Sequence, residues 1–309
     1  MADARKPGDP HRAGFVAIVG RPNVGKSTLL NRLVGQKLAI VSPKPQTTRG
    51  RILGVITRPD AQVALLDTPG LHTAKGGLNA RMVQQALQTL SDADLAAFLI
   101  EAGPPFIDAA TRKALDQVKA AHKPTLLVIN KVDTVPRAQV LPLIARWKDL
   151  HPWTDVYPLS ALKGENVDGF LDALIRHLPE GPPMFPPEQW TDLQERDLSA
   201  ELIREQLLRQ TGQEVPYSAA VLIEQFDESE RSVGPRGLVR VSATVLVERD
   251  SQKAIVIGKG GARLKEIGTA ARREMERLLG SKVFLQIHVR VEPGWTRTDK
   301  GLRRAGYEG

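Results

Sequence analysis

The chain has 309 residues, enough for about two domains that each bury their own core. Hydrophobic residues make up 41% and charged residues 25%, a soluble globular composition, and the lack of cysteine excludes disulfides, thiolate catalysis and cysteine-ligated metal sites. The formal net charge of +8 favours an anionic partner.

Residues 1–12 are rich in charge, proline and glycine and contain no apolar segment. This composition predicts a disordered tail rather than a signal peptide or an anchor. No later apolar run approaches the roughly 18 residues of a membrane-spanning helix. We therefore expect a cytoplasmic protein.

A glycine-rich motif spans Gly20–Ser27, with the pattern glycine, four residues, glycine-lysine-serine. The apolar run Phe15–Val19 before it predicts a buried strand, and the spacing of Thr28–Leu33 after it predicts a helix. In this context backbone N–H groups form an anion nest at a helix N-terminus, with Lys26 near the outer phosphates and the Ser27 hydroxyl placed to bind Mg²⁺. An ordinary glycine turn would also fit the pattern when it is taken alone.

Residues 35–50 lack periodicity and contain two prolines, which predicts a mobile loop. A β-hairpin is expected next, with strands over 51–57 and 62–66. The second strand runs into Asp67–Gly70. A carboxylate at the end of a strand, followed by a glycine that lets a phosphate approach, is typical of the place where a nucleotide-binding sheet senses Mg²⁺ and the terminal phosphate.

Two further apolar runs, 95–100 and 125–129, predict strands separated by a helix over 108–121. Strands that alternate with helices build a mostly parallel sheet covered on both faces. We therefore expect an α/β domain.

A further motif, Asn130–Asp133, follows the strand at 125–129. A carboxylate at Asp133 can accept both the ring N–H and the amino group of guanine, a donor pair that adenine does not offer. A last strand over 156–159 leads into Ser160–Lys163, whose backbone can donate to the guanine carbonyl, and a helix over 167–178 closes the domain.

Each of these four-residue motifs (tetrads) could be structural by itself. The ordered set, with motifs following predicted strands, resembles a translation-factor-type GTPase domain with a P-loop. Thr47 or Thr48 supplies its second motif, and Thr48 is taken here as the metal ligand. The resemblance implies GTP as substrate and Mg²⁺ held by Ser27, Thr48 and Asp67. It also implies nucleotide contacts from Gly20, Arg21, Pro22, Asn23, Val24, Gly25, Lys26, Ser27, Thr28, Asp67, Thr68, Pro69, Gly70, Asn130, Lys131, Asp133, Ser160, Ala161 and Leu162.

Two positions bear on hydrolysis. Leu71 stands where many GTPases have the glutamine that orients water, which predicts slow intrinsic turnover. Asn23 is similar to the asparagine of potassium-dependent relatives and could hold K⁺ against the phosphates; alternatively it only tolerates a turn conformation. The expected catalytic residues are Lys26, Asn23, Thr48, Asp67 and Gly70.

Residues 179–187 contain five prolines in nine positions, which excludes a helix or a central strand. We expect a stiff connector there. The expected elements after it are a helix over 192–209, strands over 218–225 and 238–247, a helical segment before Gly258, a helix over 263–279 and a strand over 283–291.

The second glycine motif, Gly258–Gly261, lies between two helical segments, unlike a dinucleotide fingerprint, which follows a strand. A plain corner between two helices is the alternative. The element order resembles a smaller α+β type II KH domain, in which such a loop clamps the backbone of about four nucleotides. The resemblance implies RNA contacts from Ile257, Gly258, Lys259, Gly260, Gly261, Arg263, Lys265 and Arg272.

Charge is unevenly distributed along the chain. Residues 183–248 carry 6 Lys and Arg against 12 Asp and Glu, whereas residues 249–309 carry 14 against 7. This late excess favours a polyanion-binding face, although a solvated helix face would also explain the cations on 263–279.

The whole arrangement resembles the Era family across residues 13 to about 307, including strings at 216–218, 256–258 and 294–307. The resemblance implies a tail over 1–12, a GTPase domain over 13–178, a linker over 179–190 and a KH domain with a basic tail over 191–309. It further implies a monomer that binds 16S ribosomal RNA near its 3′ end, assists maturation of the small (30S) subunit, associates peripherally with the inner membrane and binds no DNA.

Two rival functions remain: an RNA-binding scaffold with a structural nucleotide, and a membrane-associated signalling GTPase. We also expect GTP to order Thr47 and Thr48 and the loop after Asp67, and thereby to reorient the KH domain.

Overall fold

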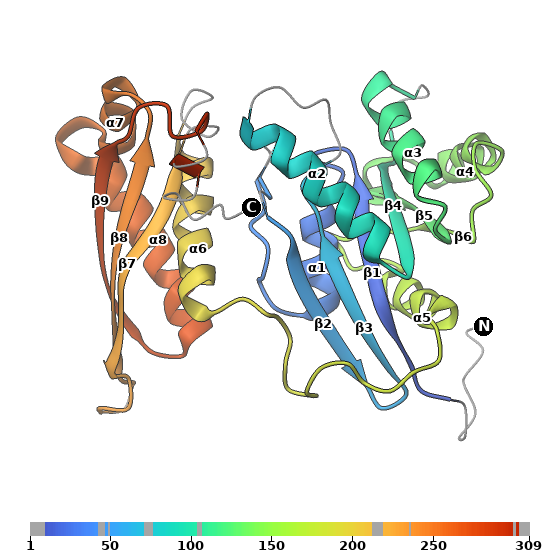
Figure 1. The fold of residues 1–309 in the computed structure, drawn as a ribbon, viewed down its shortest axis with the longest axis horizontal. Helices are drawn as coiled ribbons and strands as arrows, with labels where there is room; N and C mark the ends of the chain where they lie inside the picture. Colours follow the sequence, from blue (N-terminus) through green and yellow to red (C-terminus); the bar gives the residue numbers. More distant parts are fainter. Residues whose placement is uncertain are drawn as a thin grey trace. The chain divides into compact units, whose positions relative to one another are not determined.

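The computed structural model describes residues 10–42, 47–48, 50–70, 77–103, 107–211, 219–234, 236–298 and 301–302. The chain divides into two compact units, with the boundary between Asp192 and Leu193. Each unit has its own sheet and its own core (Figure 1).

The first unit is built on a six-stranded sheet in the order β2-β3-β1-β4-β5-β6. Its strands are β1 (Arg12–Gly20), β2 (Ile52–Arg58), β3 (Ala61–Asp67), β4 (Leu95–Glu101), β5 (Thr125–Asn130) and β6 (Asp155–Pro158). Only the β2–β3 pair is antiparallel, which confirms the predicted hairpin and the mostly parallel sheet. Every residue of β3 and β5 is buried, because helices cover both faces.

The helices of this unit are α1 (Lys26–Val34), α2 (Gly77–Asp92), α3 (Ala109–Ala121), α4 (Val140–Lys148) and α5 (Val167–His177), with short 3-10 turns η1 (Val132–Thr134) and η2 (Arg137–Gln139). Residues of α2, α3 and α4 share one core cluster with β4 and β5, while α1 and α5 pack together on β1 and β3 (Figure 1). The helices α2 and α4 are absent from the predicted elements. Because β1, β3 and β5 are parallel to one another, their carboxyl ends bring Gly20, Asp67 and Asn130 to one edge.

The proline-rich segment is bound to the first unit rather than free of it. The Gln62 side chain, which is fully buried, accepts the N–H groups of Met184 at 2.6 Å and Phe185 at 2.8 Å, and donates to the Phe185 carbonyl at 2.8 Å. Further along, Val55 on the edge strand β2 donates to the Trp190 carbonyl at 2.9 Å. The segment therefore follows the edge of the sheet.

The second unit has a three-stranded sheet in the order β7-β8-β9. Its elements are α6 (Glu195–Gln210), β7 (Ala220–Glu230), β8 (Leu238–Val247), α7 (Asp250–Ile257), the 3-10 turn η4 (Lys259–Gly261), α8 (Ala262–Leu279) and β9 (Lys282–Val291). β7 and β8 are antiparallel, whereas β8 and β9 are parallel. The observed order of elements confirms the predicted α+β unit with its glycine loop between two helices.

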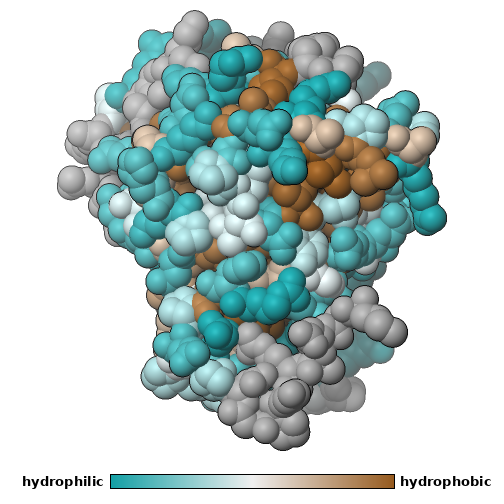
Figure 2. Space-filling view, turned by 90° about the vertical axis from the view of Figure 1, so that its right-hand side faces the viewer, coloured by the Kyte–Doolittle hydropathy of each residue, from teal (hydrophilic) through white to brown (hydrophobic). Residues whose placement is uncertain are grey.

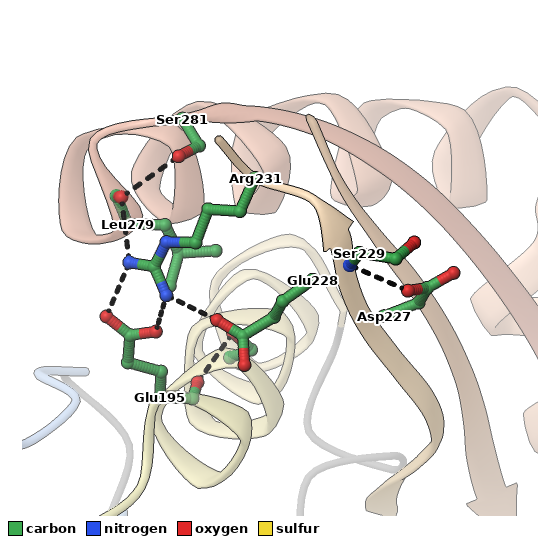
Figure 3. A network of polar contacts seen from close by, with 8 residues as sticks. Glu195, Asp227, Glu228, Ser229, Arg231, Leu279 and Ser281 are labelled. Atoms are coloured by element: carbon green, nitrogen blue, oxygen red, sulfur yellow. Dashed lines mark hydrogen bonds and ion pairs between the residues drawn. The ribbon is translucent and has the colours of Figure 1, made fainter. Parts of the chain in front are cut away.

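A network around Arg231 ties three parts of the second unit together (Figure 3). Its guanidinium contacts both oxygens of Glu195 at the start of α6, the Glu228 carboxylate on β7, and the Leu279 carbonyl at the end of α8. These hydrogen bonds raise the pKa of Arg231 above its usual range, so the group stays charged. The network fixes the first turn of the helix that follows the connector.

The surface in Figure 2 is mostly hydrophilic, with patches of apolar side chains between the polar ones. Among the described residues, no helix combines the length and the apolar character that crossing a membrane requires.

Candidate functional site

The first glycine loop turns sharply between β1 and α1. Asn23 and Gly25 have φ angles of 65° and 100°, so the backbone enters the left-handed region twice. A Cβ atom at Gly25 would lie 2.2 Å from the Asn130 side chain, and one at Gly70 would lie 2.7 Å from the backbone nitrogen of Pro22. The glycines are therefore needed for close approach between the loop and its neighbours.

Lys26 lies beneath this loop. Its side chain is buried, and Nζ donates to the carbonyls of Gly20 at 3.2 Å and Arg21 at 3.0 Å. Burial lowers the pKa of Lys26 to about 8, an effect that attraction to Asp67 partly offsets. A polyphosphate in the loop would raise the pKa of this amine again.

Ser27, Thr48 and Asp67 form a cluster of oxygen atoms beside Lys26. The Asp67 Oδ2 atom accepts from Ser27 Oγ at 2.7 Å and from Thr48 Oγ1 at 3.2 Å, and the two hydroxyls are 2.9 Å apart. Burial raises the pKa of Asp67 against the pull of Lys26, and Asp67 Oδ1 is buried with no partner among the described residues. Two hydroxyls and a carboxylate are the hard oxygen ligands that suit Mg²⁺. The three residues fit that ion, and the position of the Thr48 hydroxyl favours Thr48 over Thr47.

Asn130 holds three loops together. Its Nδ2 donates to the Val24 carbonyl at 2.8 Å, its Oδ1 accepts from the Ala161 N–H at 3.0 Å, and its carbonyl accepts from the Ala102 N–H at 2.7 Å. The side chain thus links the phosphate loop to the tetrad after β6. The structure gives it a positioning role that the sequence pattern alone did not indicate.

The base-recognition tetrads lie beside this asparagine. Asp133 is exposed in η1, and Lys131 adopts a φ angle of 64°. In the second tetrad the Ala161 N–H is taken by Asn130 and the Lys163 N–H donates to Ser160 Oγ at 3.1 Å. The Ala161 and Lys163 N–H groups of this tetrad therefore have acceptors within the protein.

Arg21 and Arg32 make contacts that sequence reasoning missed. The Arg21 guanidinium pairs with Asp108 and lies 3.7 Å from Glu101, which also pairs with Lys131 at 3.1 Å. The Arg21 side chain therefore anchors the loop through these two carboxylates. Arg32 on α1 donates to the carbonyls of Ala161 at 3.1 Å and Leu162 at 2.5 Å. No local spacing signals these partners, which are 80 or more residues away in sequence.

The second glycine loop opens onto a groove of about 390 Å³ between α8 and β9. The groove is lined by Gly261, Leu264, Lys265, Gly268, Thr269, Arg272, Leu285 and Ile287. Of the predicted RNA residues, Gly261, Lys265 and Arg272 line it. Arg263 instead donates to the Ile255 carbonyl at 2.6 Å, which fixes the end of α7 beside the loop.

The other predicted loop residues are not among those that line the groove. Gly258 has a φ angle of 73°, and a Cβ atom there would lie 2.8 Å from the Arg263 Cβ. Lys259 and Gly260 form η4 with Gly261, and Ile257 ends α7. The apolar lining residues Leu264, Leu285 and Ile287, together with cations at the rim, can accept a flat apolar ring with an anionic chain beside it.

Several predictions fall outside the described residues: Leu71 after Gly70, and the matching strings at 216–218 and 305–307. They stay predictions.

Comparison with known proteins bears on both sites. A family model described as 50S ribosome-binding GTPase matches residues 15–131, and a KH-domain model matches residues 214–296. The chain is 48% identical over 299 residues to GTPase Era of Geobacter metallireducens, covering 97% of this chain and 99% of that one. It is 47% identical over 301 residues to GTPase Era of Coxiella burnetii, covering 97% and 99%.

Two solved structures share the fold. A crystal structure of Era in complex with MgGDPNP and nucleotides 1506–1542 of 16S ribosomal RNA matches with a TM-score of 0.91 at 43% identity, covering 97% of this chain and 100% of that one. A variant of Aquifex aeolicus Era bound to GDP and AlF4⁻ matches with a TM-score of 0.91 at 42% identity, covering 96% and 100%. The predicted pairing of a P-loop GTPase domain with a KH domain is confirmed, and the chain belongs to the Era family of GTPases.

Proposed function

We propose that this chain is a Mg²⁺-dependent GTP-hydrolysing switch that binds the 3′ region of 16S ribosomal RNA and assists maturation of the small ribosomal subunit. The observation that carries the proposal is the presence, on one polypeptide, of the Ser27–Thr48–Asp67 cluster and the groove beside Gly258–Gly261. The family relationship supports it, because a related Era was crystallised with MgGDPNP and nucleotides 1506–1542 of that RNA.

In the first unit we assign residues 13–178 to GTP binding and hydrolysis, preceded by a tail over 1–12. Ser27, Thr48 and Asp67 would hold Mg²⁺, which when bound neutralises charge on the phosphates. Lys26 supplies a further cation under the loop, and we assign the Gly70 N–H to the terminal phosphate. Asp133 accepts the guanine donors.

Asn23 is our candidate K⁺ ligand. A cation at this position would neutralise charge that develops on the transferred phosphoryl group. Exchange of K⁺ for Na⁺ should therefore slow hydrolysis in the unaltered chain, whereas an unchanged rate would remove K⁺ from the proposal.

In the second unit we assign residues 191–309 to RNA binding and residues 179–190 to the linker. The glycine loop clamps the sugar-phosphate backbone, while Lys265 and Arg272 contribute charge at the groove.

We propose a monomer that acts in the cytoplasm and has a peripheral contact with the inner membrane. Flotation with vesicles of anionic and neutral lipid tests that contact, and no co-flotation would remove it.

Multiple-turnover phosphate release from GTP tests the enzymatic part. The unaltered chain should release many equivalents of phosphate, and Lys26→Ala should abolish this release. A single equivalent from the unaltered chain would instead favour the rival function, an RNA-binding scaffold with a structural nucleotide.

Guanine selection is tested by Asp133→Asn. Loss of two hydrogen bonds to a charged acceptor should weaken GTP binding about a hundredfold. Titration with a fluorescent GTP analogue measures this, and unchanged affinity would refute the assignment of Asp133.

RNA binding is tested with a labelled oligoribonucleotide that carries nucleotides 1506–1542 of 16S ribosomal RNA, the segment present in the related structure. Filter binding in the GTP-analogue and GDP states measures both the contact and its coupling to nucleotide. Equal affinity in the two states would remove the coupling while leaving the binding function intact.

A further inference from the structure

Arg32 joins helix α1 to the loop that follows β6. The first turn of α1 carries Ser27 of the oxygen cluster, and Arg32 lies further along the same helix. The Arg32 Nε atom donates to the Ala161 carbonyl at 3.1 Å, and its Nη2 atom donates to the Leu162 carbonyl at 2.5 Å. One guanidinium therefore binds two successive peptide groups of the base loop, which we define as residues 160–164.

The two halves of the base loop are held in different ways. Ser160 and Ala161 are buried, and the Ala161 N–H donates to the Asn130 side chain at 3.0 Å. Leu162 is 66% exposed, so packing of its side chain does not fix its peptide group. The hydrogen bonds from Arg32 therefore reach the loop at the point where burial ends.

The Arg32 guanidinium lies along the turn that closes the base loop. Gly164 has a φ angle of 81°, and its N–H donates to the Ser160 carbonyl at 2.8 Å. A Cβ atom at Gly164 would lie 3.8–3.9 Å from three atoms of the guanidinium, which is an ordinary van der Waals distance. The guanidinium is thus packed beside the turn as well as hydrogen-bonded to the loop, and both contacts restrict the conformations that the loop adopts.

The hydrogen bonds from Arg32 also act on the N–H groups of the base loop. In a trans peptide the carbonyl and the next N–H lie on opposite sides, so fixing the Ala161 carbonyl fixes the direction of the Leu162 N–H. The Leu162 carbonyl shares a peptide group with the Lys163 N–H, which donates to Ser160 Oγ at 3.1 Å. A charged donor on a carbonyl polarises the peptide group and makes its N–H a stronger donor.

We propose that Arg32 is a positioning residue for guanine nucleotides: from α1 it holds the base loop in the conformation that presents backbone N–H groups to the guanine carbonyl. The inference rests on the proposed assignment of Ser160–Lys163 to guanine, and it adds the side chain that keeps this loop ready for the base. Because Ser27 on the same helix belongs to the oxygen cluster assigned to Mg²⁺, α1 links the base end of the site to the phosphate end.

Arg32→Ala in the full chain tests the inference. Loss of two hydrogen bonds from a charged donor should weaken GDP binding about tenfold, mainly through faster dissociation. The KM for GTP should rise by a similar factor while kcat stays within about twofold, because the contacts of Arg32 lie at the base end of the site. Stopped-flow displacement of a fluorescent GDP analogue measures the dissociation, and phosphate release measures the kinetic constants.

A base analogue separates positioning from general damage to the site. The diphosphate of 6-thioguanosine keeps the ring N–H and the amino group that we assign to Asp133, but it replaces the carbonyl oxygen with sulfur, a weaker acceptor. The unaltered chain should bind this analogue about fivefold more weakly than GDP. In Arg32→Ala the preference for GDP should shrink to about twofold or less, because the loop no longer presents its donors to the oxygen.

Two further variants serve as controls. Arg58→Ala removes a guanidinium elsewhere in the first unit, where it pairs with Asp172, and GDP should dissociate from it at the rate of the unaltered chain. Arg32→Lys keeps a cation with several donors on α1, and it should recover part of the affinity and part of the preference for GDP over the thio analogue. Equally fast dissociation from Arg58→Ala and Arg32→Ala would contradict a specific role for Arg32.

An unchanged rate of GDP dissociation in Arg32→Ala would overturn the inference. An equal loss of affinity for GDP and for the thio analogue would overturn it as well, because Arg32 would then stabilise the site without orienting the loop toward the guanine carbonyl. Equal binding of the two nucleotides by the unaltered chain would instead overturn the proposed assignment of Ser160–Lys163 to guanine, so the two failures are distinguishable.

Discussion

Glu101, at the end of β4, joins the two halves of the nucleotide site. One carboxylate oxygen pairs with Lys131 at 3.1 Å and the other lies 3.7 Å from Arg21. Lys131 belongs to the base tetrad and Arg21 to the phosphate loop. A single acidic side chain therefore contacts two residues that we assign to opposite ends of the same ligand.

The variant Glu101→Gln should speed GDP dissociation about two- to fivefold, since each of these partly exposed ion pairs contributes about 0.2–1 kcal/mol. Stopped-flow displacement of a fluorescent GDP analogue measures the rate. Asp172→Asn is the matched control, because it breaks a comparably exposed ion pair with Arg58 outside the motif residues, and its rate should equal that of the unaltered chain. Equal rates in Glu101→Gln and this control would show that Glu101 has no positioning role.

At the scale of elements, local pattern predicted most of the fold, although β7 continues to Glu230, beyond the predicted end at residue 225. The parallel strands were found because runs such as 95–100 are apolar on both faces. The helix α2 was missed although Met82, Ala86 and Leu90 are buried at a spacing of four, and α4 was missed although Leu143 and Trp147 share that spacing. In these two helices the buried apolar residues therefore show the periodicity of an amphipathic helix.

The contacts that sequence could not give are long-range. Gln62 binds Phe185 across 123 positions and Arg21 binds Asp108 across 87. No local periodicity encodes such pairs, because they arise only when the sheet has brought distant segments together. Four of the nucleotide motifs were predictable because they follow strands β1, β3, β5 and β6, whereas the groove wall residues Leu285 and Ile287 resemble ordinary strand positions.

The Arg231 network predicts how the second unit responds to mutation. Arg231→Ala would remove contacts with Glu195, Glu228 and the Leu279 carbonyl, and should destabilise this unit by about 1–3 kcal/mol. Faster amide exchange in α6 and α8 would report the change. Arg277→Ala is the control, since that side chain is 73% exposed and pairs with Glu274 of its own helix, and it should change exchange little. Identical exchange in both variants would contradict a structural role for the network.

The first unit should lose stability in mild acid through His151, which packs edge-on against Trp153 with ring centroids 4.8 Å apart. Burial, reinforced by Lys119, lowers the pKa of His151 below its usual value of 6.5. The unfolded chain therefore takes up a proton more readily, so stability is lost as the pH falls through about 6.5 toward the folded-state pKa. The urea midpoint measured at about pH 7.5 and 5.5 should fall less in His151→Gln, and an equal fall would contradict the prediction.

For the whole molecule, the joint between the units is shorter than the proline content suggests. The segment through Asp192 is hydrogen-bonded to the first unit, and α6 begins at Glu195 with Gln194 as its capping residue. The attached segment therefore ends close to the first turn of α6. Since β2 follows the loop that carries Thr48, a shift of this edge strand would be passed directly to the segment that leads into α6.

Gln62→Ala should release that segment, because three hydrogen bonds to Met184 and Phe185 would be lost. At about 1 kcal/mol each, their loss should raise the local opening of residues 181–189 by about two orders of magnitude. Hydrogen exchange or limited proteolysis measures the opening. The exposed Gln88→Ala on α2 is the control, and equal opening in both variants would show that Gln62 does not hold the segment. If the RNA affinity of Gln62→Ala no longer depends on the bound nucleotide, this attachment transmits the nucleotide state to the RNA-binding unit.

The attached connector also decides where this protein can be recombined with others. A chimera cut before Pro179 would strip Gln62 and the edge of β2 of the partners they have here, and would expose apolar and amide groups along the sheet. A cut after Asp192 keeps these contacts of the first unit and falls at the boundary between the two units. We therefore expect chimeras that join another RNA-binding domain to this GTPase domain to fold when the junction lies after Asp192.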